Sequence, residues 1–381
     1  MTQPSHGDSQ ADSVSAGASP LVPLVRLVRR AIQGNAGWLP FDRFMALALY
    51  APGLGYYAHG SRKFGLMPAS GSDFVTAPEL SPMFGATLAA QVRQALEATA
   101  TDEVWEFGAG SGALAAQLLQ ALGAQVRRYT IVDVSGSLRA RQRELLASFG
   151  QRVRWLDALP DTLRGVVVGN EVLDAMPVQL LHWDGSKWFE RGVVAAGEGF
   201  EFADRASDLR PPLAAAFVPG TTTEIHPQSE AFIRTLADRL ECGAAFFIDY
   251  GFPEAEYYLP ERSQGTLVCH QGHRMDCDPL ADIGAKDITA HVNFSAVALT
   301  AQDAGFEVLG YTAQARFLLN CDIATLMNAA QQLSDWPALA AAQKLIAEHE
   351  MGELFKVIGL VKGAAAFDAI GFAQGDRSHR L

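Results

Sequence analysis

The sequence of 381 residues is poor in cysteine, in basic residues and in long apolar runs. Its four cysteines include no C-x-x-C pair, which is typical of a reducing compartment rather than a disulfide framework. No apolar run reaches the roughly 18 residues that a membrane-spanning helix needs. We therefore expect no membrane span.

Basic residues are outnumbered, because 30 Lys and Arg stand against 42 Asp and Glu, a formal net charge of −12. An acidic surface repels the phosphate backbone of nucleic acids. The densest basic run, RARQRELL at 139–146, alternates along a predicted helix and is typical of a solvated face. We expect no nucleic-acid partner, and the charge favours basic partners instead.

The first twenty residues contain no Lys or Arg and are rich in Ser, Ala and Gly. A secretory signal begins with a positively charged region, and transit peptides are rich in Arg. We therefore expect residues 1–20 to form a disordered tail. The corresponding expectation for the protein is a cytoplasmic location.

One cluster of metal-ligating residue types stands in CHQGHRMDC, at 269–277. Cys269, His270, His273 and Cys277 are a set that zinc could accept. Their spacing is irregular, however, and the adjacent Cys269 and His270 would both have to face one ion. No metal site is predicted.

The chain divides by its patterns into a cap and a larger second region. Apolar residues three and four apart predict two helices before Pro52, and 53–85 form a long loop rich in Gly, Pro, Ser and aromatics. Such a loop is either functional or a surface insertion. We assign 21–100 to an N-terminal cap of helices and loops, and 101–381 to a ligand-binding domain.

Alternating strand and helix patterns follow from residue 101 onward, and they predict an α/β fold with a parallel, doubly wound sheet. After Pro177 the pattern changes to short alternating runs separated by Gly turns. These predict an inserted antiparallel β meander near 178–205. A second, loop-rich insertion is expected near 251–294.

A glycine-rich turn stands in VWEFGAGSGALAA, at 104–116, where Gly108, Gly110 and Gly112 follow a short apolar strand and precede a helix. Glycines let the backbone approach a ligand closely, and the N–H groups at the start of the helix face it. The same pattern also fits a tight strand-to-helix turn without a ligand. The residues around the turn must decide between the two.

Acidic and amide side chains follow the next strands at the same predicted edge of the sheet. Asp133 stands 21 positions after Gly112, where a carboxylate can accept hydrogen bonds from both ribose hydroxyls. Asp157 ends the third strand and suits an adenine or its amino group. Asn170 and Glu171 end the fourth. Open α/β sheets bind ligands in this crevice, so a nucleotide site is expected.

Two nucleotide classes fit the turn, and Glu106 distinguishes between them. A dinucleotide prefers G-x-G-x-x-G and brings a pyrophosphate, which a neighbouring carboxylate repels. The amino group of an aminoacyl sulfonium is instead attracted by that carboxylate. Glu106 therefore favours S-adenosylmethionine as the cofactor.

Several long motifs in a fixed order resemble one known family. The glycine turn is similar to motif I of class I S-adenosylmethionine-dependent methyltransferases. Together with GLGYYAHG, GNEVLDAMPV, IDYG and DITAHVNFS, it resembles the MidA-like family. That family includes a mitochondrial protein arginine methyltransferase that assists assembly of respiratory complex I. The resemblance implies a Rossmann-like sheet of seven strands, the last antiparallel, with helical and loop caps.

The resemblance also implies an activity, protein arginine N-methylation, and roles for residues. Glu106, Gly108, Gly110 and Gly112 would hold the methionine part, and Asp133 the ribose. Asn170 belongs to both the cofactor site and the catalytic set. That catalytic set comprises Glu171, Asn170, Glu79, Asp73 and His291.

The catalytic roles are hypotheses with alternatives beside them. A guanidinium is protonated at every working pH and its forked donors match carboxylates. Glu171, with Glu79 or Asp73, would grip it, and His291 would accept a proton. Equally, Glu79 could complement a helix dipole, and His291 could be a hydrogen-bonded structural residue.

The resemblance also suggests what accepts the methyl group. We expect a basic or arginine-containing protein, with a subunit of respiratory complex I as one candidate. A small-molecule N- or O-methyltransferase is an alternative from the same enzyme class. An alternative from outside the enzymes is a non-catalytic assembly factor that binds S-adenosylmethionine.

Overall fold

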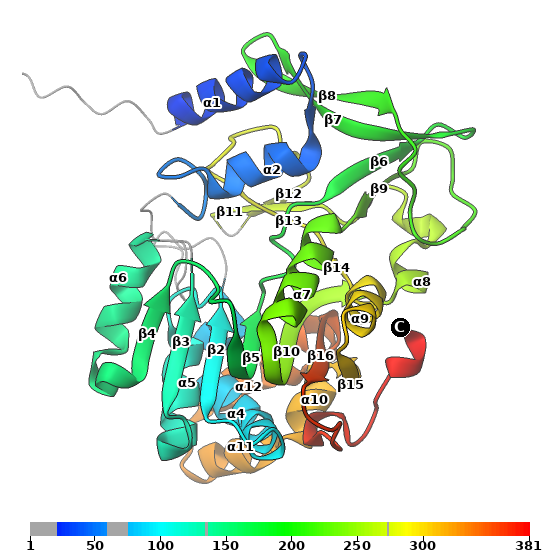
Figure 1. Cartoon of the computed structure of the whole chain (residues 1–381). Helices are drawn as coiled ribbons and strands as arrows, with labels where there is room; N and C mark the ends of the chain where they lie inside the picture. Colours follow the sequence, from blue (N-terminus) through cyan, green and yellow to red (C-terminus); the bar gives the residue numbers. More distant parts are fainter. Residues whose placement is uncertain (1–20, 59–74, 134–135, 273) are drawn as a thin grey trace, which may run out of the picture.

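The computed structural model describes residues 21–58, 75–133, 136–272 and 274–381. The expected tail at 1–20, the catalytic candidate Asp73 and the possible metal ligand His273 lie outside these ranges. Within them the chain forms one main sheet, two smaller sheets and the helices that cover them (Figure 1).

The main sheet has the predicted Rossmann-like order. Its seven principal strands run β4, β3, β2, β5, β10, β16, β15, and the short β14 pairs with the end of β10. The first five of these are parallel, whereas β16 is antiparallel to both of its neighbours. The strands are β2 (Glu103–Phe107), β3 (Arg128–Val132), β4 (Val153–Leu156), β5 (Leu163–Asn170), β10 (Leu240–Phe252), β14 (Val292–Asn293), β15 (Glu307–Ala313) and β16 (Phe355–Lys362).

The central strands are apolar on both faces, as a sheet covered on both sides requires. Along β5, Val166 and Val168 point to one core while Val167 points to the other. The register keeps the two rows separate, because Val104 lies opposite Val166 and Trp105 opposite Val167. The continuous apolar runs of the sequence therefore correspond to strands buried on two faces.

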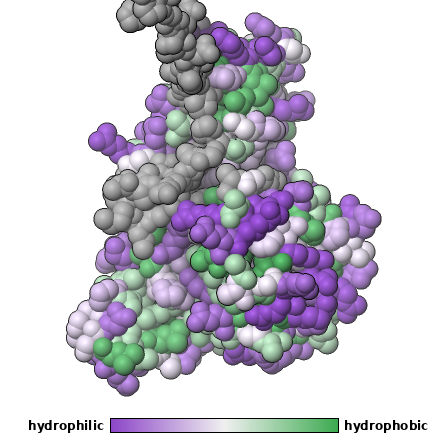
Figure 2. Space-filling model, turned by 90° about the vertical axis from the view of Figure 1, so that its left-hand side faces the viewer, coloured by the Kyte–Doolittle hydropathy of each residue, from purple (hydrophilic) through white to green (hydrophobic). Residues whose placement is uncertain are grey.

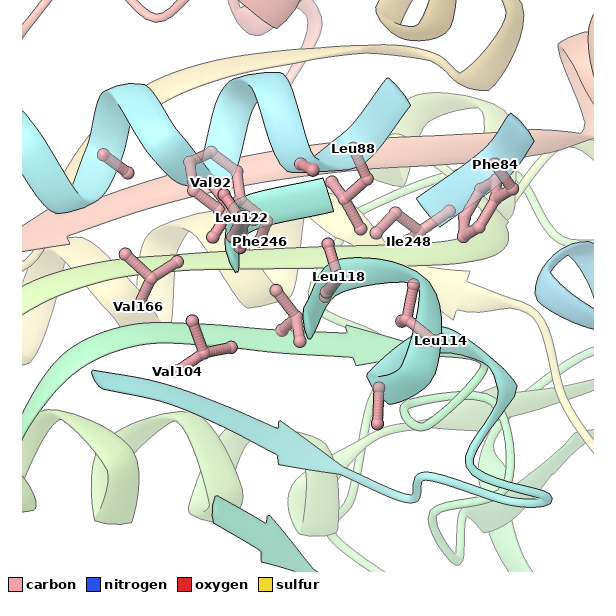
Figure 3. Packing of buried hydrophobic residues seen from close by; sticks show 14 of the residues in the cluster. Phe84, Leu88, Val92, Val104, Leu114, Leu118, Leu122, Val166, Phe246 and Ile248 are labelled. Atoms are coloured by element: carbon pink, nitrogen blue, oxygen red, sulfur yellow. The ribbon is translucent and has the colours of Figure 1, made fainter. Parts of the chain in front are cut away.

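Helices cover both faces of this sheet. One face packs against α4 (Pro82–Ala98), α5 (Ala113–Leu122), α10 (Gln314–Asn320), α11 (Ile323–Gln332) and α12 (Trp336–Ile346). The other packs against α7 (Pro227–Arg239) and α9 (Phe294–Asp303). Figure 3 shows the first core, in which Leu88 of α4 and Leu118 of α5 lie over the strands. At the β4 edge lies α6 (Gly136–Leu145).

The predicted antiparallel meander forms a second sheet, which also takes strands from outside the range 178–205. It consists of β1 (Leu39–Pro40), β6 (Gln179–Trp183), β7 (Trp188–Ala196), β8 (Gly199–Ala206) and β9 (Thr222–Ile225), all paired antiparallel. The amphipathic helices α1 (Leu21–Gly34) and α2 (Phe41–Tyr50) share a core with it. These elements lie together at one end of the main sheet (Figure 1). The division of the chain near residue 100 stays a proposal.

The insertion near 251–294 contains a third, small antiparallel sheet. Its strands are β11 (Val268–Gln271), β12 (Arg274–Asp276) and β13 (Asp287–Thr289), and α8 (Glu254–Tyr257) precedes them. A further short helix, α3 (Ala77–Leu80), precedes α4. Cys269 is buried in β11 whereas Cys277 is exposed. Within the described ranges, no three His, Cys, Asp or Glu side chains are grouped as metal ligands.

Some large apolar side chains of the described residues are exposed, among them Met275, Leu333 and Trp336. On the face shown in Figure 2, patches of apolar residues are separated by hydrophilic residues. In the part of the chain that the structure describes, none of the helices has the length and apolar character to cross a bilayer. Small-molecule ligands bind in concave pockets, so a ligand site is expected in a cavity.

Candidate functional site

A cavity of about 1110 Å³ lies at the carboxyl ends of the parallel strands. Single ligands usually occupy pockets of about 300–1,000 Å³, so this one has room for more than one small group. Its walls come from the glycine turn, from the ends of β3, β5 and β10, from α2 and from the third sheet. This is the crevice in which open α/β sheets bind ligands.

The glycine turn shapes one wall with backbone that other residues adopt at a cost. Gly108, Gly110 and Gly112 have φ angles of +62°, +53° and +88°, in the left-handed region. Gly108 and Gly110 line the cavity, whereas Gly112 caps the start of α5. A Cβ on Gly108 would stand 3.1 Å from a methyl group of Val172. The Gly108 and Gly112 N–H groups donate to the Val132 and Ala109 carbonyls, at 3.3 and 2.7 Å. The turn therefore brings backbone to the cavity wall without a side chain on its glycines.

Glu106 is the last residue but one of β2, just before the glycine turn, and it lines the cavity. Its side chain is 2% exposed, and the Tyr129 hydroxyl donates a hydrogen bond of 2.8 Å to Oε2. Burial raises the pKa of Glu106 to about 8, and the charge of Asp133 adds to the effect. Tyr129 opposes it. A cation beside this carboxylate would favour its ionised form.

Asp133 is held in place by Gln142, a residue that the sequence analysis missed. The Gln142 Nε2 group donates to Asp133 Oδ2 at 2.8 Å and to the Gly110 carbonyl at 2.9 Å. The Trp155 indole donates to Gln142 Oε1 at 3.0 Å. The interpretation of 139–146 as a solvated face is wrong at Gln142 and Leu146, which are 0% and 1% exposed. Gln142 and Leu146 stand four positions apart, and this helical spacing was the only sign in the sequence that one face of the run is buried.

Asp157 is not brought into the cavity. It follows β4 with its side chain 86% exposed, and it forms an ion pair of 2.5 Å with Arg139. Arg139 also donates to the Asp133 carbonyl at 3.0 Å. The position of Asp157 at a strand end was the basis of its predicted role, and the ion pair turns its carboxylate to Arg139 instead.

Asn170 and Glu171 lie side by side where β5 ends. Asn170 Nδ2 donates to Glu171 Oε1 at 3.0 Å, and the Ala77 backbone N–H also hydrogen-bonds to this carboxylate. Glu171 has a φ of +54°, an uncommon conformation for a residue with a side chain. Burial raises the pKa of Glu171 to about 8, with a further contribution from the charge of Asp174.

The turn after β5 is fixed by Asp249, which is fully buried in β10. Its Oδ2 atom accepts hydrogen bonds from the backbone N–H groups of Val172, Leu173 and Asp174, at 3.1, 2.9 and 3.3 Å. Glu171 N–H bonds to the Ile248 carbonyl at 2.9 Å. The Asp of the IDYG motif therefore holds the backbone that presents Asn170 and Glu171.

Further acids and tyrosines line the cavity beyond Glu171, and sequence reasoning gave them no role. Asp174 accepts a short hydrogen bond from the Tyr250 hydroxyl. Asp287 accepts one of 2.9 Å from the Tyr57 hydroxyl. Tyr50 stacks on Tyr57 with ring centroids 5.5 Å apart. All five stand in or beside motifs that carried the resemblance, which was the available signal.

The remaining catalytic candidates have different positions. His291 lines the cavity, stacked on Phe252 with ring centroids 5.2 Å apart and ring planes 1° apart. Burial lowers its pKa to about 4, so the ring is neutral at neutral pH. Glu79 is hydrogen-bonded to Ser111 of the glycine turn, and burial raises its pKa. Pro78 and Leu80 line the cavity, whereas Glu79 does not.

The cavity is lined with many acidic side chains and few basic ones. Among its described lining residues, Lys344 is the single lysine or arginine. The acids of the lining are Glu106, Asp133, Glu171, Asp174, Asp287 and Glu350. Such a lining suits cationic ligands, because a bound cation favours the ionised form of nearby carboxyl groups. S-adenosylmethionine is a ligand of this kind.

Comparison with known proteins agrees with the site. Residues 86–312, more than half of the chain, match the family model described as "Putative S-adenosyl-L-methionine-dependent methyltransferase". The mitochondrial protein arginine methyltransferase NDUFAF7 is 26% identical in both Danio rerio and Mus musculus. The matches cover 86% and 94% of this chain, and 84% and 87% of those proteins.

A solved structure shows the same fold. The crystal structure of a Burkholderia thailandensis protein bound to S-adenosyl-homocysteine is 51% identical, with a TM-score of 0.88. The match covers 95% of this chain and 97% of that one.

The sheet order and the crevice therefore define an S-adenosylmethionine-dependent methyltransferase with a Rossmann-like fold. The chain belongs to the methyltransferase family whose model it matches, and the resemblance to the MidA-like family is confirmed. Its cofactor is S-adenosylmethionine, as Glu106 and the glycine turn predicted.

The predicted cytoplasmic location is contradicted by the same comparisons. The relatives from Danio rerio and Mus musculus are mitochondrial proteins by name. The prediction depended on the composition of residues 1–20, which lie outside the described ranges. Composition of a short terminal segment is weak evidence for a compartment.

Proposed function

We propose that this methyltransferase modifies the guanidinium group of an arginine side chain in a protein. The observation that carries the proposal is the acidic and tyrosine-rich end of the cavity beyond Glu171, where a second cation fits beside the cofactor. The NDUFAF7 relatives, which are named protein arginine methyltransferases, support it. A subunit of respiratory complex I stays a specific candidate acceptor.

The residues of the glycine turn and Asp133 would hold the cofactor, which supplies a methyl group on a positively charged sulfur. Glu106 would pair with the cofactor ammonium, and the Gln142 amide would keep Asp133 turned toward the ribose hydroxyls. Methyl transfer depends on an in-line approach of the acceptor nitrogen. The protein therefore contributes mainly positioning and charge.

Glu171 would grip the guanidinium and orient the nitrogen that is methylated. Its carboxylate lies on the cavity wall, and Asn170 and the Ala77 N–H fix its direction. When the new N–C bond forms, that nitrogen must lose a proton. His291 lines the cavity, and its buried Nδ1 has no hydrogen-bond partner among the described residues, so this nitrogen could accept the proton. We assign the proton to His291.

Glu79 would act one step away from the acceptor. Its hydrogen bond with Ser111 connects the start of α3 to the glycine turn. We therefore propose that Glu79 supports the cofactor side of the cavity. A direct contact of Glu79 with the acceptor is less consistent with its absence from the cavity lining.

A labelling experiment distinguishes this function from its alternatives. The purified protein is incubated with S-adenosylmethionine that carries a radiolabelled methyl group and with lysate of cells that lack the enzyme. We expect label in the protein fraction, and none with the Glu171→Gln variant. Label confined to small molecules would indicate a small-molecule methyltransferase, and no label anywhere would favour a non-catalytic assembly factor.

A further inference from the structure

We propose that Asp174 and Asp287, together with Tyr57 and Tyr250, form an acceptor subsite that selects a guanidinium over an ammonium. The inference rests on the proposed function, and it adds the residues that would determine the choice of acceptor. Neither aspartate had a role in the sequence-based site. Both line the cavity next to Glu171.

Asp174 offers an unused hydrogen-bond acceptor. The residue is 5% exposed, and its Oδ2 atom is occupied by the Tyr250 hydroxyl. Its Oδ1 atom is buried and has no hydrogen-bond partner among the described residues. The Oδ1 atom of Asn170 is in the same condition. Because a buried acceptor without a donor costs free energy, this pair of oxygens fits a ligand that brings donors.

Asp287 supplies a second carboxylate from a different element. It lies in β13 and is 2% exposed, and Tyr57 donates to its Oδ2 atom. The Ala290 N–H donates to the Asp174 carbonyl at 3.0 Å, which ties the third sheet to the turn after β5. The charge of Asp287 acts on Glu171 and on Tyr50. The two carboxylates therefore act on the same part of the cavity from separate walls.

Tyrosine rings complete the subsite. Tyr50 and Tyr57 are stacked at 18° between ring planes, and the Tyr50 hydroxyl is anchored on the Ala175 carbonyl at 2.8 Å. The Tyr250 ring packs edge-on against His291 with centroids 5.0 Å apart. A guanidinium stacks on aromatic faces and is weakly hydrated, whereas an ammonium is a compact and strongly hydrated charge.

The arrangement favours a planar cation with several donors. A guanidinium carries five N–H donors in a fixed fork, so it can bond acceptors on separate walls at the same time. An ammonium has three donors that radiate from one point. Placing it at Asp174 Oδ1 would leave the buried Asn170 Oδ1 atom without a donor, which is unfavourable.

The charge state of the subsite follows from the same burial. Burial raises the pKa of Asp174 to about 6 and that of Glu171 to about 8. A bound guanidinium would favour the ionised forms and lower both values. Acceptor binding at pH 6 to 7 should therefore release protons to the solvent.

Short peptides provide the test. The S-adenosyl-homocysteine complex is titrated by calorimetry with acetylated Gly-Arg-Gly amide, and with the peptides in which lysine or citrulline replaces arginine. We expect the arginine peptide to bind at least about tenfold more tightly than either of the others. Asp174→Asn should weaken it at least about tenfold, while the S-adenosyl-homocysteine affinity stays within about twofold.

Matched variants keep the test decisive. Asp184→Asn, at an exposed turn of the second sheet, should bind as the wild type does. If Asp174→Asn does not fold, Tyr57→Phe removes the hydrogen bond to Asp287 and should weaken the arginine peptide severalfold. Equal binding of the lysine peptide, or undiminished binding by Asp174→Asn or its substitute, would overturn the subsite.

The outcome separates the subsite from the proposed function. Methylarginine in labelled lysate without an arginine preference in the peptide titration would overturn the subsite alone. An arginine preference that depends on Asp174, in a protein that never labels arginine, would support the subsite and contradict the proposed function.

Discussion

At the scale of single residues, the cavity is lined by several buried carboxyl groups, with Lys344 as the one lysine or arginine among its described lining residues. Burial raises the pKa of Glu106 and Glu171 to about 8, far above the ordinary range of glutamate. An isolated buried charge is unfavourable, so such groups ionise fully only when a partner arrives. The protein therefore has carboxyl groups ready for both the cofactor ammonium and a cationic acceptor.

Replacing Glu106 by Gln should weaken cofactor binding. The change removes the negative charge opposite the cofactor ammonium and keeps the shape of the side chain. We expect the affinity for S-adenosyl-homocysteine to fall about 10- to 100-fold, as measured by calorimetry. Glu103→Gln, at the other end of β2 and paired with Arg127, is the control and should bind normally. Unchanged affinity in Glu106→Gln would refute the assigned role.

Glu171 should separate binding from transfer. Because its carboxylate is assigned to the acceptor, Glu171→Gln should keep the affinity for S-adenosyl-homocysteine within about twofold and lose at least about 100-fold in methyl transfer. Both quantities are measured on the same preparation, with labelled cofactor for the transfer rate. A variant that transfers methyl groups at the wild-type rate would exclude Glu171 from catalysis.

The sequence predicted site residues where one contiguous motif contains them. Gly108, Glu106 and Asn170–Glu171 follow directly from strand ends, and they line the cavity. Gln142 could not be found in this way, because it is one buried amide in a charged helix. The charge of Asp287 acts on Glu171 because the folded insertion brings two residues together that are far apart in the sequence. Asp157 follows a strand end as predicted, but the structure places its carboxylate on Arg139 and outside the cavity lining.

At the scale of elements, the turn after β5 depends on a partner from the neighbouring strand. Asp249 accepts three backbone N–H groups there, and Glu171 keeps its left-handed φ beside them. These hydrogen bonds to Asp249 offset the cost of the strained backbone at Glu171. The IDYG and GNEVLDAMP motifs are therefore two halves of one structural unit.

Asp249→Ala should cost both stability and activity. It leaves three N–H groups without their acceptor in a buried turn, so we expect the free energy of unfolding to fall by about 2–4 kcal/mol. Urea unfolding with and without S-adenosyl-homocysteine measures it. Asp249→Asn keeps one side-chain oxygen as an acceptor and should lose less. Equal stability of wild type and Asp249→Ala would show that the turn does not depend on the Asp249 carboxylate.

The sequence also predicted elements unevenly. The parallel strands were predicted because they are apolar on both faces and alternate with amphipathic helices. The strands β1, β12 and β13 have two or three residues, too few for a period to be visible. Their positions depend on partners that are distant in the sequence, such as β7 for β1. The third sheet could therefore be identified only in the structure.

At the scale of the whole molecule, two small sheets and two helices close the open end of a Rossmann-like sheet. The cavity that results is lined by the carboxyl ends of the main sheet and by residues of α2 and the third sheet. Under the proposed function, the insertions would add an acceptor site for a second cation to a common nucleotide fold. Exclusion of water from such a site strengthens every charge interaction within it.

The pH dependence of stability should follow from the raised pKa values. Glu106 and Glu171 titrate near pH 8 in the folded protein and near 4.5 in the unfolded chain. Their contribution to stability is therefore present below pH 4.5 and is lost as the pH rises through 8. The cofactor ammonium offsets part of this loss at Glu106.

Stabilisation by S-adenosyl-homocysteine should consequently increase between pH 5.5 and 7.5, by up to about tenfold in affinity per pH unit. Thermal unfolding at several pH values measures the effect. Glu106→Gln should show a nearly flat dependence. Equal stabilisation of the wild type at both pH values would mean that Glu106 is not the group that meets the ammonium.

The identity of the methylated amino acid tests the central claim most directly. Protein from the labelled lysate is hydrolysed in acid, and the labelled amino acid is identified by chromatography against standards. An acceptor end built for a guanidinium predicts that the label is recovered as methylarginine and is absent when Glu171→Gln is used. Recovery of the label as methyllysine or another methylated residue would contradict the account.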